Sequence, residues 1–529
     1  MIKNHTEKKY FLILTLLAGI IAVFPQILYQ PFLMQGDHGR DLYQYQQTAH
    51  GAIPYLDYAT DNGPLMPCYY SLFLNTFGDN IQSVLIGYAL MILAAGLVIF
   101  LIAQHHLAPM TAFLAALWYW AWRGQEFFYT FNHIGALTTG LVTLMFAIKA
   151  IHKNDNRFFF SGIFWSLLTF LIRPDIGLAA LTSLIVSSLL FQKNSLMRHK
   201  SVFTISTITL AGSVIILNLF FPEILGPYFK SIEWSQFFSN LKQLFQIWFN
   251  FAAQTQFTSA LSLILISLML AGLIRMWKDR EEEGTVHYFK TLFTVMIFII
   301  FFLGEYLLGS RFFRWIWIMP LTFLTMFYLI DAGMRSLTKW ARVTAYAVLI
   351  ITCSGLILSQ YAQILVSKEH HAALKINGTY LLMGEDQTLW IDTVQQTTAF
   401  IDKHTKPQEP ILVLPYDALY GFLARRPLAT KETGLFNFNS KQIIREIEEK
   451  NIRLILISNR AFHHNEETRF GLLGRDYGQE FVDYLNSRYY LAGTYGPWEK
   501  TATPIYNHAT RIYLKTDSLP DRINIIDIN

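Results

Sequence analysis

The stretch Ile81–Ala103, IQSVLIGYALMILAAGLVIFLIA, contains no charged side chain. As a single α-helix it is long enough to cross a hydrocarbon core of about 30 Å. Further long apolar stretches occur at Phe11–Phe24 and Thr291–Leu308. The 529-residue chain is 53% hydrophobic and 15% charged, whereas a soluble domain has about 25% charged residues. The sequence therefore predicts a polytopic α-helical membrane protein.

Hydropathy predicts about eleven transmembrane helices within residues 1–365. The first one follows Lys3, Lys8 and Lys9, as a secretory signal would, but no small-residue cleavage site comes after it. We therefore expect an uncleaved first span. The predicted spans are residues 10–29, 81–104, 108–122, 132–150, 158–172, 175–191, 201–221, 257–276, 289–308, 312–330 and 341–363.

Basic residues cluster in alternate connections between these spans, which predicts a cytoplasmic N-terminus by the positive-inside rule. Loop 31–80, loop 222–256 and the C-terminal region would then lie outside the cytoplasm, at the periplasmic face of an inner membrane. Aromatic residues recur near helical spacing in loop 222–256, as in a helix lying in the membrane interface. The basic clusters are Lys149, Lys153 and Arg157; Lys193, Arg198 and Lys200; Arg275, Lys278 and Arg280; and Arg335, Lys339 and Arg342.

The composition changes near residue 365, after which acidic, basic and amide side chains occur throughout. Helical patterns at 389–405, 441–451 and 479–488 alternate with strand patterns at 411–414, 454–457 and 511–514. This alternation predicts a soluble extracytoplasmic α/β domain over residues 366–529, after a transmembrane module over residues 1–365. The net charge of +5 is too small to indicate a nucleic-acid partner. Two cysteines, Cys68 and Cys353, indicate no disulfide framework.

Loop 31–80 concentrates reactive polar residues next to the first span. It contains Gly36-Asp37-His38-Gly39-Arg40-Asp41, then the turn-rich segment Gly51-Ala52-Ile53-Pro54-Tyr55-Leu56-Asp57, then Asn62-Gly63-Pro64-Leu65. Ionisable groups also flank the outer ends of later spans. Such groups are costly at membrane depth and are usually functional, although snorkelling anchors are the alternative for each arginine alone. The set is Asp37, Arg40, Asp41, Arg123, Glu126, Arg173, Asp175, Glu305, Arg311 and Arg314.

Arginines and carboxylates together suit transfer of a sugar from a polyprenyl-phosphate carrier. Arginine binds phosphate through a two-pronged fork, and a carboxylate can take the proton of an attacking hydroxyl. The arginines would also stabilise the charge on the departing lipid phosphate.

The first-loop pattern resembles that of the GT-C glycosyltransferases, in the branch of protein O-mannosyltransferases and lipid A aminoarabinose transferases. That branch has an acidic residue after the first span, a Gly-x-x-Pro-Tyr-x-Asp-like turn and a Gly-Pro turn into the next span. Here Asp37, Gly51–Asp57 and Gly63-Pro64-Leu65 occupy these places, and Arg173-Pro174-Asp175 resembles a basic-Pro turn of the family. The resemblance is close over residues 35–80 and architectural elsewhere.

The resemblance implies an inverting glycosyltransferase with Asp37 as the general base. Asp41 lies one helical turn later and could share or take that role. The other residues of the ionisable set, with Tyr55 as either an interface anchor or a sugar platform, are the candidate substrate-binding residues. Asp57 is expected to cap backbone amides in its turn.

No residue is assigned as a metal ligand, because His38 beside Asp37 is a weak signal on its own. The sequence requires no cofactor and leaves open whether a divalent metal takes part. The expected partners are the polyprenyl-phosphate sugar, the lipid bilayer and an acceptor glycan, lipid or protein.

Three alternatives remain at this point. A transporter or flippase of a lipid-linked sugar would need charges at mid-membrane and internal repeats, and neither is evident. A surface-polysaccharide ligase or polymerase would share the donor chemistry but is expected to have its dominant outer loop later in the chain. A binding-only member of the same fold is the third.

Overall fold

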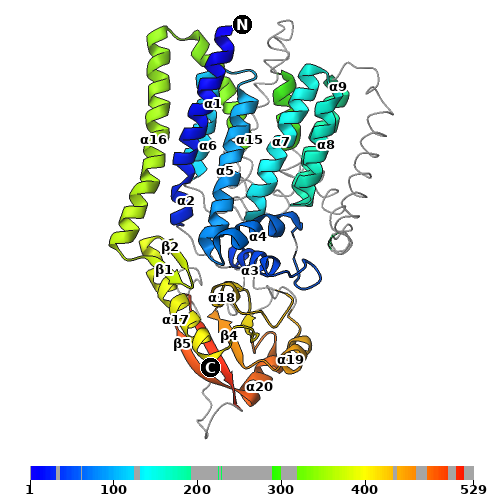
Figure 1. Cartoon of the computed structure of the whole chain (residues 1–529), viewed down its shortest axis with the longest axis vertical. Helices are drawn as coiled ribbons and strands as arrows, with labels where there is room; N and C mark the ends of the chain where they lie inside the picture. The colour runs from blue at the N-terminus through cyan, green and yellow to red at the C-terminus, as the bar shows by residue number, and fades with distance from the viewer. Residues whose placement is uncertain are drawn as a thin grey trace. The chain divides into compact units, whose positions relative to one another are not determined.

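The long apolar stretches form long helices in the computed structural model (Figure 1). Within the described residues, five helices are long and apolar enough to cross a membrane: Thr6–Leu28, Ile81–Ala103, Phe131–Lys153, Pro174–Phe191 and Lys339–Glu369. The chain is therefore a polytopic helical membrane protein. The structure describes residues 2–30, 36–60, 62–123, 131–191, 224, 228, 289–299, 319–432, 438–459, 473–498 and 508–516.

Several predicted spans coincide with observed helices. These are α1 (Ile2–Val23) with the short α2 (Pro25–Leu28), α5 (Ile81–Ala103), α6 (Pro109–Arg123), α7 (Phe131–Lys153), α8 (Asn156–Phe170), α9 (Pro174–Phe191), α15 (Met319–Ser336) and α16 (Lys339–Glu369). Residues 289–299 are an apolar helix as well. The predicted spans 201–221 and 257–276 lie outside the described residues, as does nearly all of loop 222–256. The number of eleven spans thus stays a prediction.

Contacts divide the chain into two compact units. The first unit contains residues 1–25, 61–66 and 88–360. In it α7 packs against α8 and α9, while α6 packs against α1 and α15 (Figure 1). The buried Trp120 on α6 donates a 3.1 Å hydrogen bond from Nε1 to the carbonyl of Ile92 on α5. The apolar face of α1 that carries Ile13, Leu17 and Ile21 is exposed, as expected of a surface in contact with lipid.

The second unit contains residues 26–60, 67–87 and 361–529. Its four-stranded sheet has the order β3-β4-β6-β5. Strand β3 (Leu412–Leu414) runs parallel to β4 (Leu454–Ser458), whereas β6 (Thr510–Lys515) is antiparallel to β4 and to β5 (Tyr489–Tyr495). A separate hairpin joins β1 (Ala373–Ile376) to β2 (Thr379–Leu382). The short helix η4 is Glu385–Gln387.

Helices cover this sheet and bury its central strand. All five residues of β4 are buried, because α19 (Ser440–Glu449) and α20 (Gln479–Arg488) pack on the side that carries Ile455 and Ile457, and α17 (Thr388–His404) contacts β5 and β6. The predicted helices and strands of the α/β region are thus present. The sequence did not indicate β1, β2, β5 or α18 (Leu419–Ala424).

Two helices within loop 31–80 also belong partly or wholly to the second unit. They are α3 (Asp37–Ala49) and most of α4 (Leu65–Phe77). Gln46 on α3 donates a 3.2 Å hydrogen bond to the carbonyl of Phe422 on α18, and the Tyr43 hydroxyl accepts one of 2.8 Å from the Leu428 amide. The contacts therefore group most of loop 31–80 with residues 361–529, whereas the sequence division at 365/366 stays a prediction.

Candidate active site

The first turn of α3 places Asp37, Arg40 and Asp41 on one face, because residues three and four apart are neighbours on a helix. Gly36 precedes the helix with φ at 59°, a left-handed conformation that favours glycine. Asp37 is the acidic residue of the first turn, where the helix dipole favours a negative charge.

These three side chains meet Tyr416, which lies two residues beyond β3, and we call the four residues the carboxylate cluster. The Arg40 guanidinium donates from Nε and Nη2 to Asp41 Oδ1, at 3.1 and 2.9 Å. Its Nη1 donates to the Tyr416 hydroxyl at 3.0 Å and lies 3.3 Å from Asp37 Oδ1. The Tyr416 hydroxyl donates in turn to Asp37 Oδ1.

Burial separates the two carboxylates. The Asp37 side chain is 54% exposed, whereas that of Asp41 is 0% exposed and that of Arg40 is 12% exposed. Asp37 is therefore accessible to a substrate from solvent. The buried Asp41 carboxylate accepts two hydrogen bonds from Arg40 and so fixes the orientation of its guanidinium.

Burial also sets the protonation behaviour of the cluster. It raises the pKa of Asp41 to about 6, with the nearby Asp37 charge adding to the rise, while Arg40 and a hydrogen bond from Tyr45 oppose it. Burial likewise raises the pKa of Tyr416 far above its usual value, so its phenol stays protonated. For Arg40, burial lowers the pKa, but Asp41, Tyr416 and Asp37 together outweigh that effect and raise it.

A second group of predicted residues lies in the first unit. The Gly63 amide donates to the carbonyl of Ile172 at 2.9 Å, and the Leu65 amide donates to that of Leu171 at 3.2 Å. Arg173, which follows Ile172 in the chain, forms a 2.8 Å ion pair with Asp175. The side chains of Arg173 and Asp175 are 15% and 22% exposed. The Gly63-Pro64 turn is thus joined by two backbone hydrogen bonds to the segment that leads into Arg173-Pro174-Asp175.

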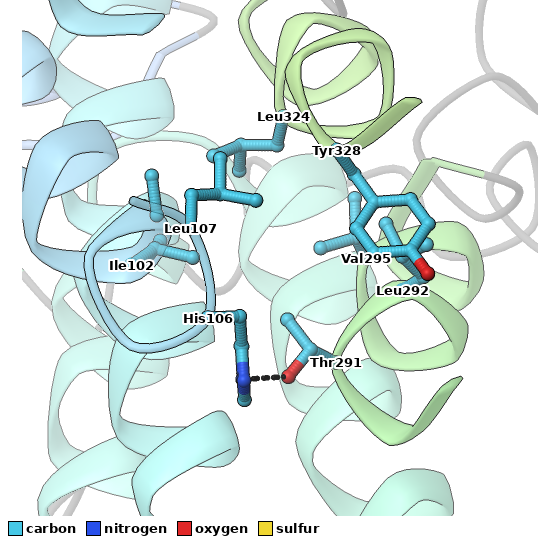
Figure 2. Close-up of a pocket in the computed structure, with 9 residues that line it drawn as sticks. Ile102, His106, Leu107, Thr291, Leu292, Val295, Leu324 and Tyr328 are labelled. Carbon is cyan, nitrogen blue, oxygen red and sulfur yellow. Dashed lines mark hydrogen bonds between the residues drawn. The ribbon is translucent and has the colours of Figure 1, made fainter. Parts of the chain in front are cut away.

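One small pocket opens elsewhere in the first unit, between the end of α5, residues 289–299 and α15 (Figure 2). His106 and His152 both hydrogen-bond the Thr291 hydroxyl, at 2.7 and 2.9 Å. The volume of this pocket, about 20 Å³, holds little more than one water molecule. It is too small for a sugar or a lipid chain, and none of the predicted site residues lines it.

Comparison with known proteins shows similarity to one protein family and to solved structures. The family model "Dolichyl-phosphate-mannose-protein mannosyltransferase" matches residues 61–225. The crystal structure of ArnT from Cupriavidus metallidurans in the apo state is 11% identical with a TM-score of 0.55, over 95% of this chain and 98% of that one. The same protein bound to undecaprenyl phosphate is also 11% identical, with a TM-score of 0.50 over 97% of this chain and 99% of that one. Residues 61–225 thus resemble this family, and the chain shares the fold of ArnT.

Two further comparisons gave one weak structural match and no sequence match. The archaeal oligosaccharyltransferase AglB from Archaeoglobus fulgidus, in complex with an inhibitory peptide and a dolichol-phosphate, is 11% identical with a TM-score of 0.46. That match spans 97% of this chain and 75% of that one, and its likeness is too weak to carry an argument. Comparison with curated protein sequences yields no significant match.

The structure brings part of the predicted site together. Asp37, Arg40 and Asp41 meet in the carboxylate cluster, and Arg173 pairs with Asp175. Tyr55 has φ at 69° within its turn and donates its amide to the Tyr58 carbonyl at 2.9 Å. Asp57 accepts a 2.7 Å hydrogen bond from the Ile53 amide, which confirms its predicted capping role. Glu126, Glu305, Arg311 and Arg314 lie outside the described residues, as does the side chain of Arg123 at the end of α6.

Sequence reasoning missed Tyr416. A usable signal was present, since Leu414-Pro415-Tyr416-Asp417 directly follows a predicted strand, and functional groups of α/β sheets gather beyond the carboxyl ends of parallel strands. Among the described side chains, no group of three or more His, Cys, Asp or Glu residues is placed to hold a metal ion. No metal ligand is therefore assigned to them.

The raised pKa of Asp41 predicts that the stability of the protein depends on pH. Between about pH 4 and pH 6 the folded state binds more protons than the unfolded state, so stability falls as the pH rises, by at most about 3 kcal/mol. We expect Asp41→Asn to flatten this slope, because an amide does not titrate. Thermal unfolding in detergent at pH 4.5 to 7 measures it, and an equal slope in both proteins would contradict the assignment.

Proposed function

We propose that this protein is an inverting glycosyltransferase that uses a polyprenyl-phosphate-linked sugar. The acceptor is a hydroxyl or amine of a glycan, lipid or protein at the periplasmic face of the inner membrane, where the C-terminal α/β region also lies. The observation that carries the proposal is the exposed carboxylate of Asp37 at the start of α3, in contact with Tyr416 and Arg40. The family model and the fold likeness to ArnT support the same reaction class.

In this reaction Asp37 acts as the general base. The acceptor oxygen or nitrogen attacks the anomeric carbon from the face opposite the phosphate, and its proton passes to the Asp37 carboxylate. The new glycosidic bond forms as the bond between the anomeric carbon and the phosphate oxygen breaks. The polyprenyl phosphate departs with the electron pair of that bond.

Arg40 and Asp41 support this base. Arg40 lies 3.3 Å from Asp37 Oδ1, and its charge favours the ionised carboxylate. Asp41 is wholly buried and acts as a positioning residue, since its carboxylate holds the guanidinium on the other side. The two acids on α3 therefore have different tasks.

The donor phosphate would be bound by arginines at the outer ends of the spans. Arg173 is the described member of this set. Its ion pair with Asp175 orients the guanidinium, and the backbone just before Arg173 is hydrogen-bonded to Gly63 and Leu65. ArnT from Cupriavidus metallidurans, which shares the fold, was solved with undecaprenyl phosphate. We assign Arg123, Arg311 and Arg314 to the same task. Substrate contacts are assigned to Tyr55, Glu126, Asp175 and Glu305.

Mass spectrometry of surface glycolipids and glycans tests the proposal. Cells with the wild-type protein should contain a species heavier by one sugar residue than the matching species in cells without it. A transporter or flippase would instead change how much lipid-linked sugar reaches the outer leaflet, without forming a new glycosidic bond in a purified system. Identical glycan profiles, together with altered leaflet distribution of the lipid-linked sugar, would overturn the enzymatic assignment.

A further inference from the structure

We propose that Tyr416 is a positioning residue for the catalytic base, so that the C-terminal α/β region supplies part of the catalytic centre. The inference rests on the proposed role of Asp37. The new point is that a residue of the α/β region contacts the base. Tyr416 is 379 positions from Asp37 in the sequence and follows a strand of the sheet.

The sheet holds the segment that carries Tyr416. Tyr416 lies just beyond the carboxyl end of β3, and its neighbour Asp417 accepts a hydrogen bond from the hydroxyl of Ser458 at the end of β4. Both Asp417 and Ser458 are 1% exposed. The parallel pairing of β3 with β4 therefore determines where Tyr416 emerges.

The following helix, α18, is anchored in the same way. The Tyr420 hydroxyl contacts His508 Nε2 at 2.9 Å and the Thr510 hydroxyl at 2.8 Å, both beside or in β6. The same helix contacts α3 through the hydrogen bond from Gln46 to the Phe422 carbonyl. Tyr416 is thus connected on one side to three strands and on the other to the helix that carries Asp37.

The donor and acceptor chemistry of the cluster fixes the direction of the Tyr416 hydroxyl. A guanidinium can only donate hydrogen bonds, so the Tyr416 oxygen accepts the bond from Arg40 Nη1. Its single proton is then directed to Asp37 Oδ1. A hydrogen bond to the ionised carboxylate favours that form and limits its rotation, which keeps the base charged and oriented for the acceptor.

Tyr416→Phe tests this role, because it removes the hydroxyl and keeps the ring. We expect kcat to fall about tenfold, the size of effect of one hydrogen bond to a charged group, with little change in the KM for the lipid-linked donor. Protonation of Asp37 becomes easier without this bond, so the acid limb of the pH–rate profile should move to higher pH. The charged groups that face Tyr416 are Asp37, Arg40 and Asp41, and none of them is altered by the variant.

Tyr420→Phe is the matched control. It removes a buried phenol from the same region, but that phenol hydrogen-bonds His508 and Thr510 beside and in β6. A general weakening of the fold would affect both variants, whereas only Tyr416→Phe should move the acid limb. An unmoved limb in Tyr416→Phe would overturn the inference.

Comparison with Asp37→Asn separates this inference from the proposed function. If Asp37→Asn is inactive and Tyr416→Phe keeps the wild-type pH profile, the positioning role fails while the base assignment stands. If Asp37→Asn retains wild-type turnover, the base assignment itself fails, and the inference fails with it.

Discussion

Asp37→Asn is expected to lower the rate of sugar transfer by at least about 100-fold. General base catalysis typically contributes 10²–10⁴-fold, and an amide in place of the carboxylate cannot accept the acceptor's proton. The variant should still insert and fold, because the Asp37 side chain is 54% exposed and an asparagine oxygen can keep the hydrogen bond from Tyr416. Transfer to the acceptor by the purified protein in lipid vesicles measures the effect.

Asp57→Asn provides the control for this prediction. Asp57 is another carboxylate of loop 31–80, but it accepts a hydrogen bond from the Ile53 amide, and an asparagine can also accept that bond. We expect near wild-type transfer from this variant. Near wild-type turnover in Asp37→Asn would instead remove Asp37 as the base.

Gly63→Ala is expected to have the largest effect on stability. A β-carbon at Gly63 would lie 1.9 Å from the carbonyl oxygen of Leu171 and 2.4 Å from its carbonyl carbon. These are backbone atoms in the turn that leads to Arg173, so the clash cannot be relieved by a change of rotamer. Overpacking typically costs about 1–3 kcal/mol, and here the two hydrogen bonds from Gly63 and Leu65 are disturbed as well.

The unfolding temperature in detergent should fall by roughly 1–3 °C in Gly63→Ala, because the entropy of unfolding is large for a chain of 529 residues. Transfer activity should fall too, because the Arg173 turn is displaced. Gly355→Ala is the matched control, since apart from the adjoining turns of its own helix no described atom lies within 4 Å of a β-carbon placed there, in the middle of α16. That variant should keep or slightly raise the unfolding temperature, because alanine favours a helix over glycine by about 0.5–1 kcal/mol. Equal unfolding temperatures in Gly63→Ala and wild type would refute the packing argument.

The sequence correctly predicted the properties that depend on residues close together in the chain. The apolar stretch 81–103 forms α5 with the same bounds, and the strand and helix patterns after residue 365 correspond to observed elements such as α20 at Gln479–Arg488. The capping role of Asp57 was also readable, because it involves a residue only four positions away.

The sequence did not indicate that the Asp37 side chain is exposed and the Asp41 side chain is buried. Both are aspartates on one helical face, and the family resemblance left the choice of base open. The packing around α3 leaves Asp37 exposed and removes Asp41 from solvent, so that burial raises the pKa of Asp41 to about 6. Exposure depends on the surroundings of a residue, which no local pattern contains.

The sequence by itself determined the membrane class, the apolar helices and the grouping of Asp37, Arg40 and Asp41 at the start of α3, because hydrophobicity and helical periodicity act over a few turns of chain. Only the tertiary structure decided that Tyr416 joins this group and that the Gly63 turn meets the turn before Arg173. Those contacts depend on the pairing of β3 with β4 and on the close approach of two backbones. The first joins Leu412 to Ile455 and the second joins Gly63 to Ile172, and the sequence carries no periodic signal over such separations.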